Sequence, residues 1–173
     1  MRLIILNGPS GVGKSTTALK LQKEIPLSHL VEVDELRRSL PGYPERREET
    51  HRLAYEHTAE IIENELTSGH DVIIDKCITD SEILDWFAEI ARKLGATEYE
   101  FLLFTDKATL RKRADARGYR AGGLLTPEKV DELWEKMDTL REKRPQAIVV
   151  DTTQVREIFE KVWSEIESPN KSK

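Results

Sequence analysis

Eight residues near the N-terminus have the types and spacing of a phosphate-binding loop. The run Gly8-Pro9-Ser10-Gly11-Val12-Gly13-Lys14-Ser15 matches the pattern G-x-x-x-x-G-K-[ST] at every fixed position. Glycines let backbone N–H groups point inward around phosphate oxygens, and a helix N-terminus adds partial positive charge. We expect Lys14 to reach the β- and γ-phosphates of a nucleotide and Ser15 to ligate Mg²⁺. The remaining nucleotide contacts expected in this stretch come from Gly8, Ser10, Gly11, Val12, Gly13 and Thr16.

A carboxylate and an arginine stand three residues apart after a short apolar segment. Asp34 and Arg37 follow Val31 and Val33. A carboxylate at such a place can accept a proton from an acceptor hydroxyl or orient it, and an arginine can hold the acceptor or a second anionic group. The alternative for Asp34 is the N-cap of a helix over residues 35–40, and the two roles are compatible.

Two arginines lie four residues apart on a basic helix expected over residues 107–117. Arg113 and Arg117 share one face of this helix, and a glycine-rich segment with Arg120 follows. Arginines that swing over a transferring phosphoryl group stabilise its charge and exclude water. A solvated basic face paired with Asp115 is the other interpretation.

The segment Asp75-Lys76-Cys77 closes an apolar run and leaves its role open. Asp75 could hold Mg²⁺ through water, belong to the acceptor site or cap a helix. A thiol beside a lysine can have a lowered pKa, but we favour an inert Cys77. The four histidines lack metal-ligand spacing, so we expect no metal other than Mg²⁺.

Short apolar runs alternate with amphipathic stretches, which is typical of βαβ units. Strands are expected over residues 3–6, 30–33, 72–75, 99–104 and 147–150. Helices are expected over residues 14–24, 35–40, 46–67, 82–94 and 107–117, from Pro127 onward, and over 155–166. The pattern predicts an α/β fold with a mostly parallel sheet whose ligands bind beyond the carboxyl ends of the strands. The glycine-rich run then lies between a strand and a helix, which favours a phosphate-binding loop over an ordinary turn.

Composition narrows the class of protein further. The 173 residues suit one domain, and 38% hydrophobic residues are too many for a disordered chain. No apolar run approaches the roughly 18 residues needed to span a bilayer, and a single cysteine excludes an intramolecular disulfide. No signal peptide is evident, so we expect a cytoplasmic protein. The net charge of −5 gives no global attraction to long nucleic acid.

Taken in order, these motifs resemble those of the small P-loop kinases. Four motifs carry the resemblance: the phosphate loop, D-x-x-R after the second strand, R-x-x-x-R-G before a short lid, and an apolar strand ending in Asp-Thr-Thr. They are similar to the motifs of the group that contains polynucleotide 5′-hydroxyl kinase and chloramphenicol phosphotransferase, within the zeta-toxin/AAA_33-like P-loop NTPases. The resemblance covers roughly residues 2–160. It implies a three-layer P-loop fold with strand order 2-3-1-4-5 and helices on both faces. The sequence departs from the polynucleotide kinase pattern at Lys76-Cys77.

The resemblance also implies a role for each matching residue. Asp34 would activate the acceptor hydroxyl and Arg37 would position the acceptor. Arg113 and Arg117 would clamp the ATP phosphates, while the segment around Thr152 would lie beside the adenine. Residues 1–173 would form a single kinase domain, with a lid at about 117–128 and an acceptor-side segment at about 36–68.

These observations predict a magnesium-assisted enzyme that moves the γ-phosphate of ATP to a hydroxyl of a small molecule. A 5′-hydroxyl polynucleotide or nucleoside kinase is one alternative. An ATP-binding or ATPase module without a dedicated acceptor is another. A GTPase switch is disfavoured because no N/T-K-x-D motif follows a suitable strand.

Overall fold

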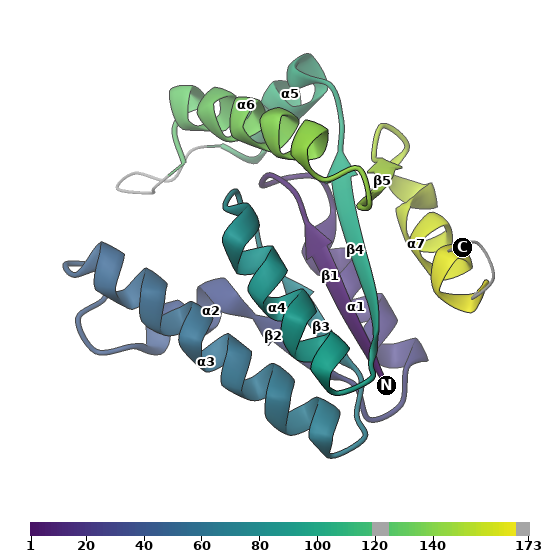
Figure 1. The fold of residues 1–173 in the computed structure, drawn as a ribbon. Helices are drawn as coiled ribbons and strands as arrows, with labels where there is room; N and C mark the ends of the chain where they lie inside the picture. Colours follow the sequence, from purple (N-terminus) through teal and green to yellow (C-terminus); the bar gives the residue numbers. More distant parts are fainter. Residues whose placement is uncertain (119–124, 169–173) are drawn as a thin grey trace.

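A computed structural model describes residues 1–118 and 125–168 of the chain. Its centre is a five-stranded parallel sheet of order β2-β3-β1-β4-β5, as predicted (Figure 1). The strands are β1 (Arg2–Asn7), β2 (His29–Glu32), β3 (Val72–Asp75), β4 (Thr97–Phe104) and β5 (Ile148–Asp151). Arg120 and the centre of the expected lid, residues 119–124, lie outside the described residues.

Helices connect the strands, and most of their bounds agree with the sequence pattern. They are α1 (Lys14–Glu24), α2 (Val33–Ser39), α3 (Arg47–Thr67), α4 (Ser81–Lys93), α5 (Lys107–Arg117), α6 (Pro127–Lys143), the 3₁₀ turn η1 (Val155–Glu157) and α7 (Ile158–Glu167). Pro127 occupies the first turn of α6, where its missing N–H costs nothing, and the Thr126 hydroxyl accepts from Lys129 N–H. In the described ranges, no helix is long and apolar enough to span a bilayer.

The alternative role of Asp34 as a helix N-cap is contradicted by the structure. Helix α2 begins at Val33, so Asp34 lies inside its first turn and Glu32 takes the cap position without a side-chain hydrogen bond. The strand passes into the helix with no loop between them, and the buried Val33 packs in the same core cluster as Val31. Asp34 therefore keeps its carboxylate for other contacts, because a capping side chain must stand outside the helix.

Alternate side chains of β1 supply the two halves of the core. Leu3 and Ile5 pack with α3 and α4 on one face of the sheet, whereas Ile4 and Leu6 pack with α1 and α7 on the other. Figure 1 shows α3 and α4 on one side of the sheet, and α5 and α6 together at the top of the view. All four of these β1 side chains are fully buried, as expected for a parallel sheet covered on both faces.

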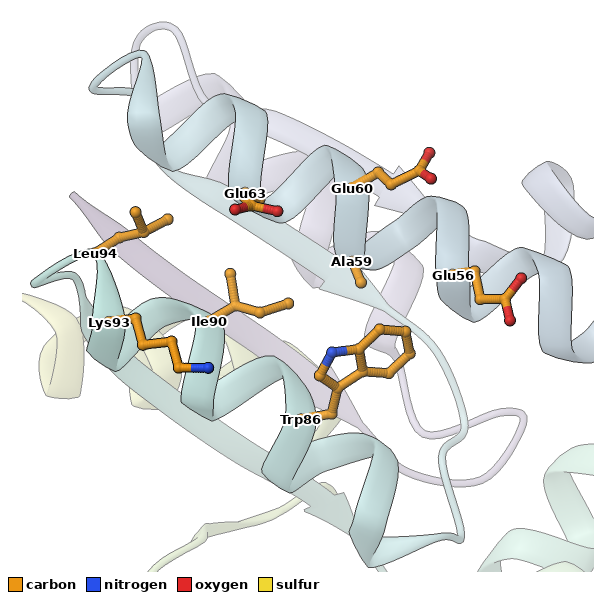
Figure 2. Close-up of a pocket in the computed structure, with 8 residues that line it drawn as sticks. All are labelled: Glu56, Ala59, Glu60, Glu63, Trp86, Ile90, Lys93 and Leu94. Carbon is orange, nitrogen blue, oxygen red and sulfur yellow. The ribbon is translucent and has the colours of Figure 1, made fainter.

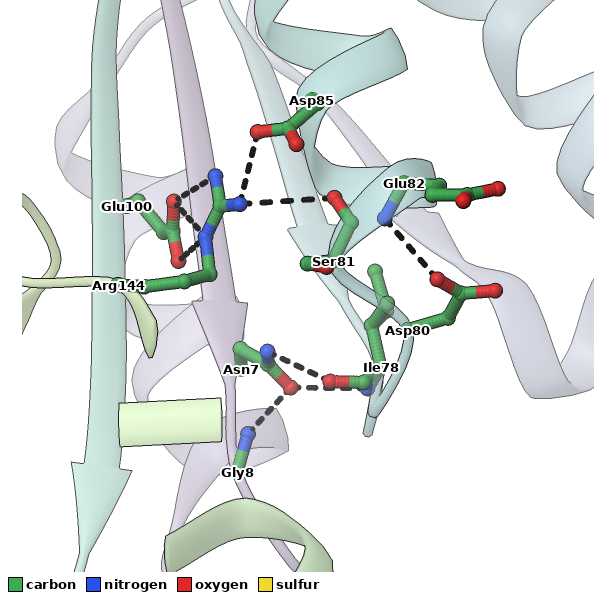
Figure 3. A network of polar contacts seen from close by, with 9 residues as sticks. All are labelled: Asn7, Gly8, Ile78, Asp80, Ser81, Glu82, Asp85, Glu100 and Arg144. Atoms are coloured by element: carbon green, nitrogen blue, oxygen red, sulfur yellow. Dashed lines mark hydrogen bonds and ion pairs between the residues drawn. The ribbon is translucent and has the colours of Figure 1, made fainter. Parts of the chain in front are cut away.

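A buried asparagine joins the phosphate loop to the segment after β3. Asn7 Oδ1 accepts hydrogen bonds from Gly8 N–H and Ile78 N–H, each at 2.8 Å, and its Nδ2 donates to Ile78 O at 2.9 Å (Figure 3). The end of β1 and the segment that carries Asp75 and Lys76 are thus held in one arrangement.

A buried ion pair ties the end of α6 to the sheet. The Arg144 guanidinium donates to both carboxylate oxygens of Glu100 on β4, each at 2.7 Å, and to Asp85 on α4 at 2.7 Å (Figure 3). The side chains of Arg144 and Glu100 are only 4% and 5% exposed. Neighbouring carboxylates therefore raise the pKa of Arg144 despite the desolvation that would lower it.

We expect Asn7→Ala to destabilise the protein by at least about 2 kcal/mol, because it leaves buried N–H and C=O groups of Gly8 and Ile78 without partners. Urea unfolding followed by circular dichroism measures the effect. Asn64→Ala on the exposed surface of α3 is the matched control and should change stability by less than about 0.5 kcal/mol. Equal effects of the two variants would contradict the role given to Asn7.

Arg144→Ala should cost about 3–5 kcal/mol, because it leaves the Glu100 carboxylate buried without its cation. The double variant Arg144→Met with Glu100→Leu removes both charges and should be less destabilised than Arg144→Ala. Arg52→Ala, which breaks an exposed pair with Glu56, should cost about 0.5 kcal/mol or less. Thermal and urea unfolding compare the three, and a double variant that is less stable than Arg144→Ala would refute this account.

Candidate active site

A cleft of about 930 Å³ opens beyond the carboxyl ends of the strands. It is lined by the phosphate loop, the first turns of α1 and α2, the end of β3, and by α5, α6 and η1. Most of the expected site residues line it together: Ser10, Gly11, Gly13, Lys14, Ser15, Thr16, Asp34, Arg37, Asp75, Arg113 and Arg117. Gly8, Val12 and Thr152, which were also expected to contact the nucleotide, are buried and do not line the cleft.

The backbone conformation of the phosphate loop requires glycine at three positions. Gly8, Gly11 and Gly13 have φ angles of +145°, +95° and +97°. A Cβ at Gly8 would lie 2.3 Å from the Leu103 carbonyl oxygen, so no larger residue fits there. Gly13 is the N-cap of α1 and has no side chain to cap it, so the first N–H groups of this helix stay available to a ligand in the cleft that Gly13 and Lys14 line. The Lys14 ammonium donates to Pro9 O at 3.1 Å.

The two arginines of α5 have different surroundings. Arg113 donates to the carbonyl oxygens of Thr152 and Thr153 at 2.7 and 3.1 Å, so its guanidinium holds the loop after β5. The exposed Arg117 lies over the phosphate loop, with Nη1 4.0 Å from the position of a Cβ on Gly11. Of the two arginines, Arg117 is therefore the better placed to meet a phosphate, while Arg113 supports the wall of the cleft.

A lysine that the sequence analysis gave no role pairs with Asp34. Lys76 Nζ donates to Asp34 Oδ1; the lysine side chain is 7% exposed and the aspartate side chain 54%. Partial burial acts to raise the pKa of Asp34, but the charge and hydrogen bond of Lys76, with smaller effects of Arg38 and Lys14, lower it overall. Asp34 is thus ionised at neutral pH. The sequence feature that could have pointed to Lys76 is its place directly after a buried strand, at the sheet edge where ligands bind.

Arg37 is held by the start of α3 and the loop before it. Its Nη2 donates to Arg47 O at 2.9 Å, its Nε to Thr50 Oγ1 at 3.4 Å, and its guanidinium lies 5.5 Å from the ring centre of Tyr43. His51 lines the same part of the cleft. Burial, and then the charges of Lys76 and Arg37, lower the pKa of His51, so this imidazole is neutral at neutral pH.

The structure excludes one of the three roles considered for Asp75 and bears on the reactivity of Cys77. Asp75 does not cap the next helix, because Asp80 is the N-cap of α4 and accepts from Glu82 N–H at 2.9 Å. Asp75 pairs in register with Leu6 of β1 and reaches the cleft beside the phosphate loop. Burial raises the pKa of the Cys77 thiol, which supports the inert cysteine favoured from the sequence.

The cleft offers few protein ligands for a metal ion. Among residues 1–118 and 125–168 there is no cluster of three or more His, Cys, Asp or Glu side chains able to hold one. Mg²⁺ at phosphates commonly keeps water and takes only one or two protein oxygens. Ser15 and the buried Asp75 provide two such oxygens in one cleft, so the donor set fits Mg²⁺.

A second hollow, of about 470 Å³, lies between α3 and α4 (Figure 2). Trp86, Ile90 and Leu94 form its apolar side, and Glu56, Glu60 and Glu63 come from α3. Carboxylates repel phosphates, and the phosphate loop contributes nothing to this surface. The larger cleft is therefore the candidate nucleotide site.

Comparisons with known proteins agree with this geometry. The model of an AAA domain family (AAA_33) matches residues 3–143. No curated protein matches the chain. The fold is similar to that of a tunicamycin resistance protein from Deinococcus radiodurans, with a TM-score of 0.70, 20% identity and coverage of 95% of each chain.

Two further solved structures share the fold. A gluconokinase from Sinorhizobium meliloti 1021 has a TM-score of 0.69 and 18% identity over 96% of this chain and 91% of its own. A chain of the Pnkp1/Rnl/Hen1 RNA repair complex has a TM-score of 0.70 and 20% identity over 82% of this chain and 45% of its own. The expected similarity to small P-loop kinases is confirmed at the level of the fold. With its phosphate loop, its strand order and a family match that spans most of its length, the chain belongs to this AAA domain family of P-loop proteins.

Proposed function

We propose that this protein is an ATP-dependent phosphotransferase that moves the γ-phosphate to a hydroxyl of a small molecule. One observation carries the proposal: a single cleft contains both Lys14 of the phosphate loop and the ionised carboxylate of Asp34. The first suits a phosphoryl donor and the second suits a hydroxyl acceptor. A module that only binds ATP has no need for the second group, whereas an ATPase could use it to orient water, so the screen below compares transfer with hydrolysis.

The donor side binds the triphosphate through backbone and side-chain groups. The N–H groups of the loop and the start of α1 surround the phosphates, and Lys14 exchanges its bond to Pro9 O for phosphate oxygens. Ser15 and Asp75 would hold Mg²⁺, which would neutralise negative charge on the nucleotide phosphates when bound. Arg117 stabilises the charge that spreads over the transferring group.

The acceptor side aligns the attacking oxygen. The acceptor hydroxyl donates a hydrogen bond to Asp34, and Arg37 contacts another part of the acceptor. Its oxygen forms a bond to the γ-phosphorus while the bond from that phosphorus to the β–γ bridging oxygen breaks. ADP leaves with the electron pair, and the hydroxyl proton passes to Asp34 and then to water.

The wall beside η1 suits the base of the nucleotide. Arg113 holds the carbonyls of Thr152 and Thr153, and Thr152 is also anchored by its hydroxyl to Phe104 O at 3.2 Å. The exposed Val155 follows and lines the cleft. A rigid loop that ends in an apolar side chain provides a surface for the flat adenine ring.

The cleft favours a small acceptor over a long nucleic acid. The whole cleft has a volume of about 930 Å³ and must hold ATP as well as the acceptor, so the space beside the nucleotide suits a small acceptor. Tyr43 and His51 are the aromatic rings that line it in the described residues, whereas single-strand channels stack successive bases on several rings. The gluconokinase with a similar fold supports this choice, and the similar fold of a chain from an RNA repair complex keeps a polynucleotide acceptor as the second candidate.

The experiment that tests the proposal is a screen with γ-labelled ATP and Mg²⁺. The panel contains hydroxyl-bearing antibiotics, nucleosides, sugars, sugar acids and 5′-hydroxyl oligonucleotides. We expect label on one small-molecule class. Label only on oligonucleotides would support the second candidate, and ATP hydrolysis that no acceptor changes would overturn the kinase proposal in favour of an ATPase module.

Asp34→Asn should keep ATP affinity and lower phosphotransfer by at least about 100-fold, because the amide cannot accept the proton. Lys14→Ala should instead weaken ATP binding itself. Calorimetry measures the affinity, and label transfer to the acceptor found in the screen measures kcat. Asp138→Asn, which breaks an exposed ion pair with Arg141, is the matched control and should retain activity. Full transfer by Asp34→Asn would reduce Asp34 to a structural residue.

A further inference from the structure

The pairing of Lys76 with Asp34 needs an explanation beyond stability. Lys76 lies in the segment directly after β3, and its backbone N–H donates to Leu6 O at 3.3 Å. The side chain is almost fully removed from water, although its partner is half exposed. Desolvating an ammonium group costs as much as such a pair returns, so a buried ion pair is weak evidence for a stabilising role.

The geometry restricts one oxygen of Asp34 and leaves the other for a ligand. Lys76 donates to Oδ1, and Oδ2 has no hydrogen-bond partner within the part of the chain that the structure describes. Because Asp34 lies in the first turn of α2 and is half exposed, its carboxylate would otherwise rotate between several rotamers.

The other charged groups around Asp34 have partners of their own. Arg38 on α2 pairs with Glu35, and Lys14 on α1 donates to Pro9 O. From α3, the ring of His51 is neutral, and burial keeps Tyr55 protonated by raising its pKa. Lys76 is thus the cation that bonds to this carboxylate in the described residues.

We propose that Lys76 is a positioning residue, which holds the Asp34 carboxylate so that its free oxygen faces the acceptor hydroxyl. This inference rests on the proposed phosphotransfer. A carboxylate that already accepts a bond from an ammonium group is a weak base, so Asp34 mainly orients the hydroxyl and takes the proton late in the transfer. The chemistry of the transfer then depends on the pair rather than on Asp34 alone.

The test combines single and double variants at the two positions. Lys76→Met should lower kcat about 10- to 100-fold, because small misplacements at a reacting centre have effects of this size, while KM for ATP changes less than about 2-fold. Lys76→Arg keeps the charge and should recover part of the loss. In the Asp34→Asn background, Lys76→Met should have no further effect on kcat.

The measurements use γ-labelled ATP and the same acceptor panel for every variant, with circular dichroism to verify folding. Lys93→Met, which removes a lysine from an exposed pair with Glu89, is the control and should keep wild-type kcat. If Lys76→Met does not fold, Lys76→Gln replaces it.

The outcomes separate this inference from the proposed function. If the wild type labels nothing in the panel, the proposed function fails and takes the role of Lys76 with it. If the wild type transfers phosphate and Lys76→Met has the same kcat, only the role of Lys76 is overturned. Equal losses from Lys76→Met in the wild type and in Asp34→Asn would also overturn it, because they show a structural effect independent of Asp34.

Discussion

The candidate site depends on the buried amide of Asn7. Its three hydrogen bonds join Gly8, the first residue of the phosphate loop, to Ile78, which follows β3. Parallel pairing of β1 with β3 brings the ends of both strands to the same edge of the sheet. Asp75 and Lys76 lie just before Ile78 in the chain. Asn7 therefore supports both the phosphate loop and the segment whose Lys76 bonds to Asp34. Neither segment can shift without leaving buried backbone groups unpaired.

Local charge in the cleft is opposite in sign to the charge of the whole chain. The net charge is −5, yet Lys14, Arg37, Lys76 and Arg117 all line one cleft. Phosphates respond to the field inside a concave site more than to a distant surface, because salt screens exposed charges beyond about 10 Å. The acidic composition is thus compatible with a polyanionic nucleotide as ligand.

Residues whose role is set by local pattern could be predicted from the sequence. The phosphate loop, the strand order implied by the resemblance and the first turn of α6 at Pro127 agree with the structure. The start of α2 could not be predicted, because it depends on packing of Val33 in the core rather than on a capping residue. The different surroundings of Arg113 and Arg117 also depend on contacts between distant segments, since Arg113 bonds to the loop 39 and 40 residues later in the chain.

The amino-acid sequence by itself determined the phosphate loop and the elements that flank it, because glycine spacing and hydrophobic periodicity act over a few residues. Only the tertiary structure decided that Asp34 pairs with Lys76, which lies 42 residues away in the chain. The sheet order places β3 between β2 and β1, so the ends of these three strands meet at one edge. An ion pair across that edge results from strand pairing, and no local pattern encodes it.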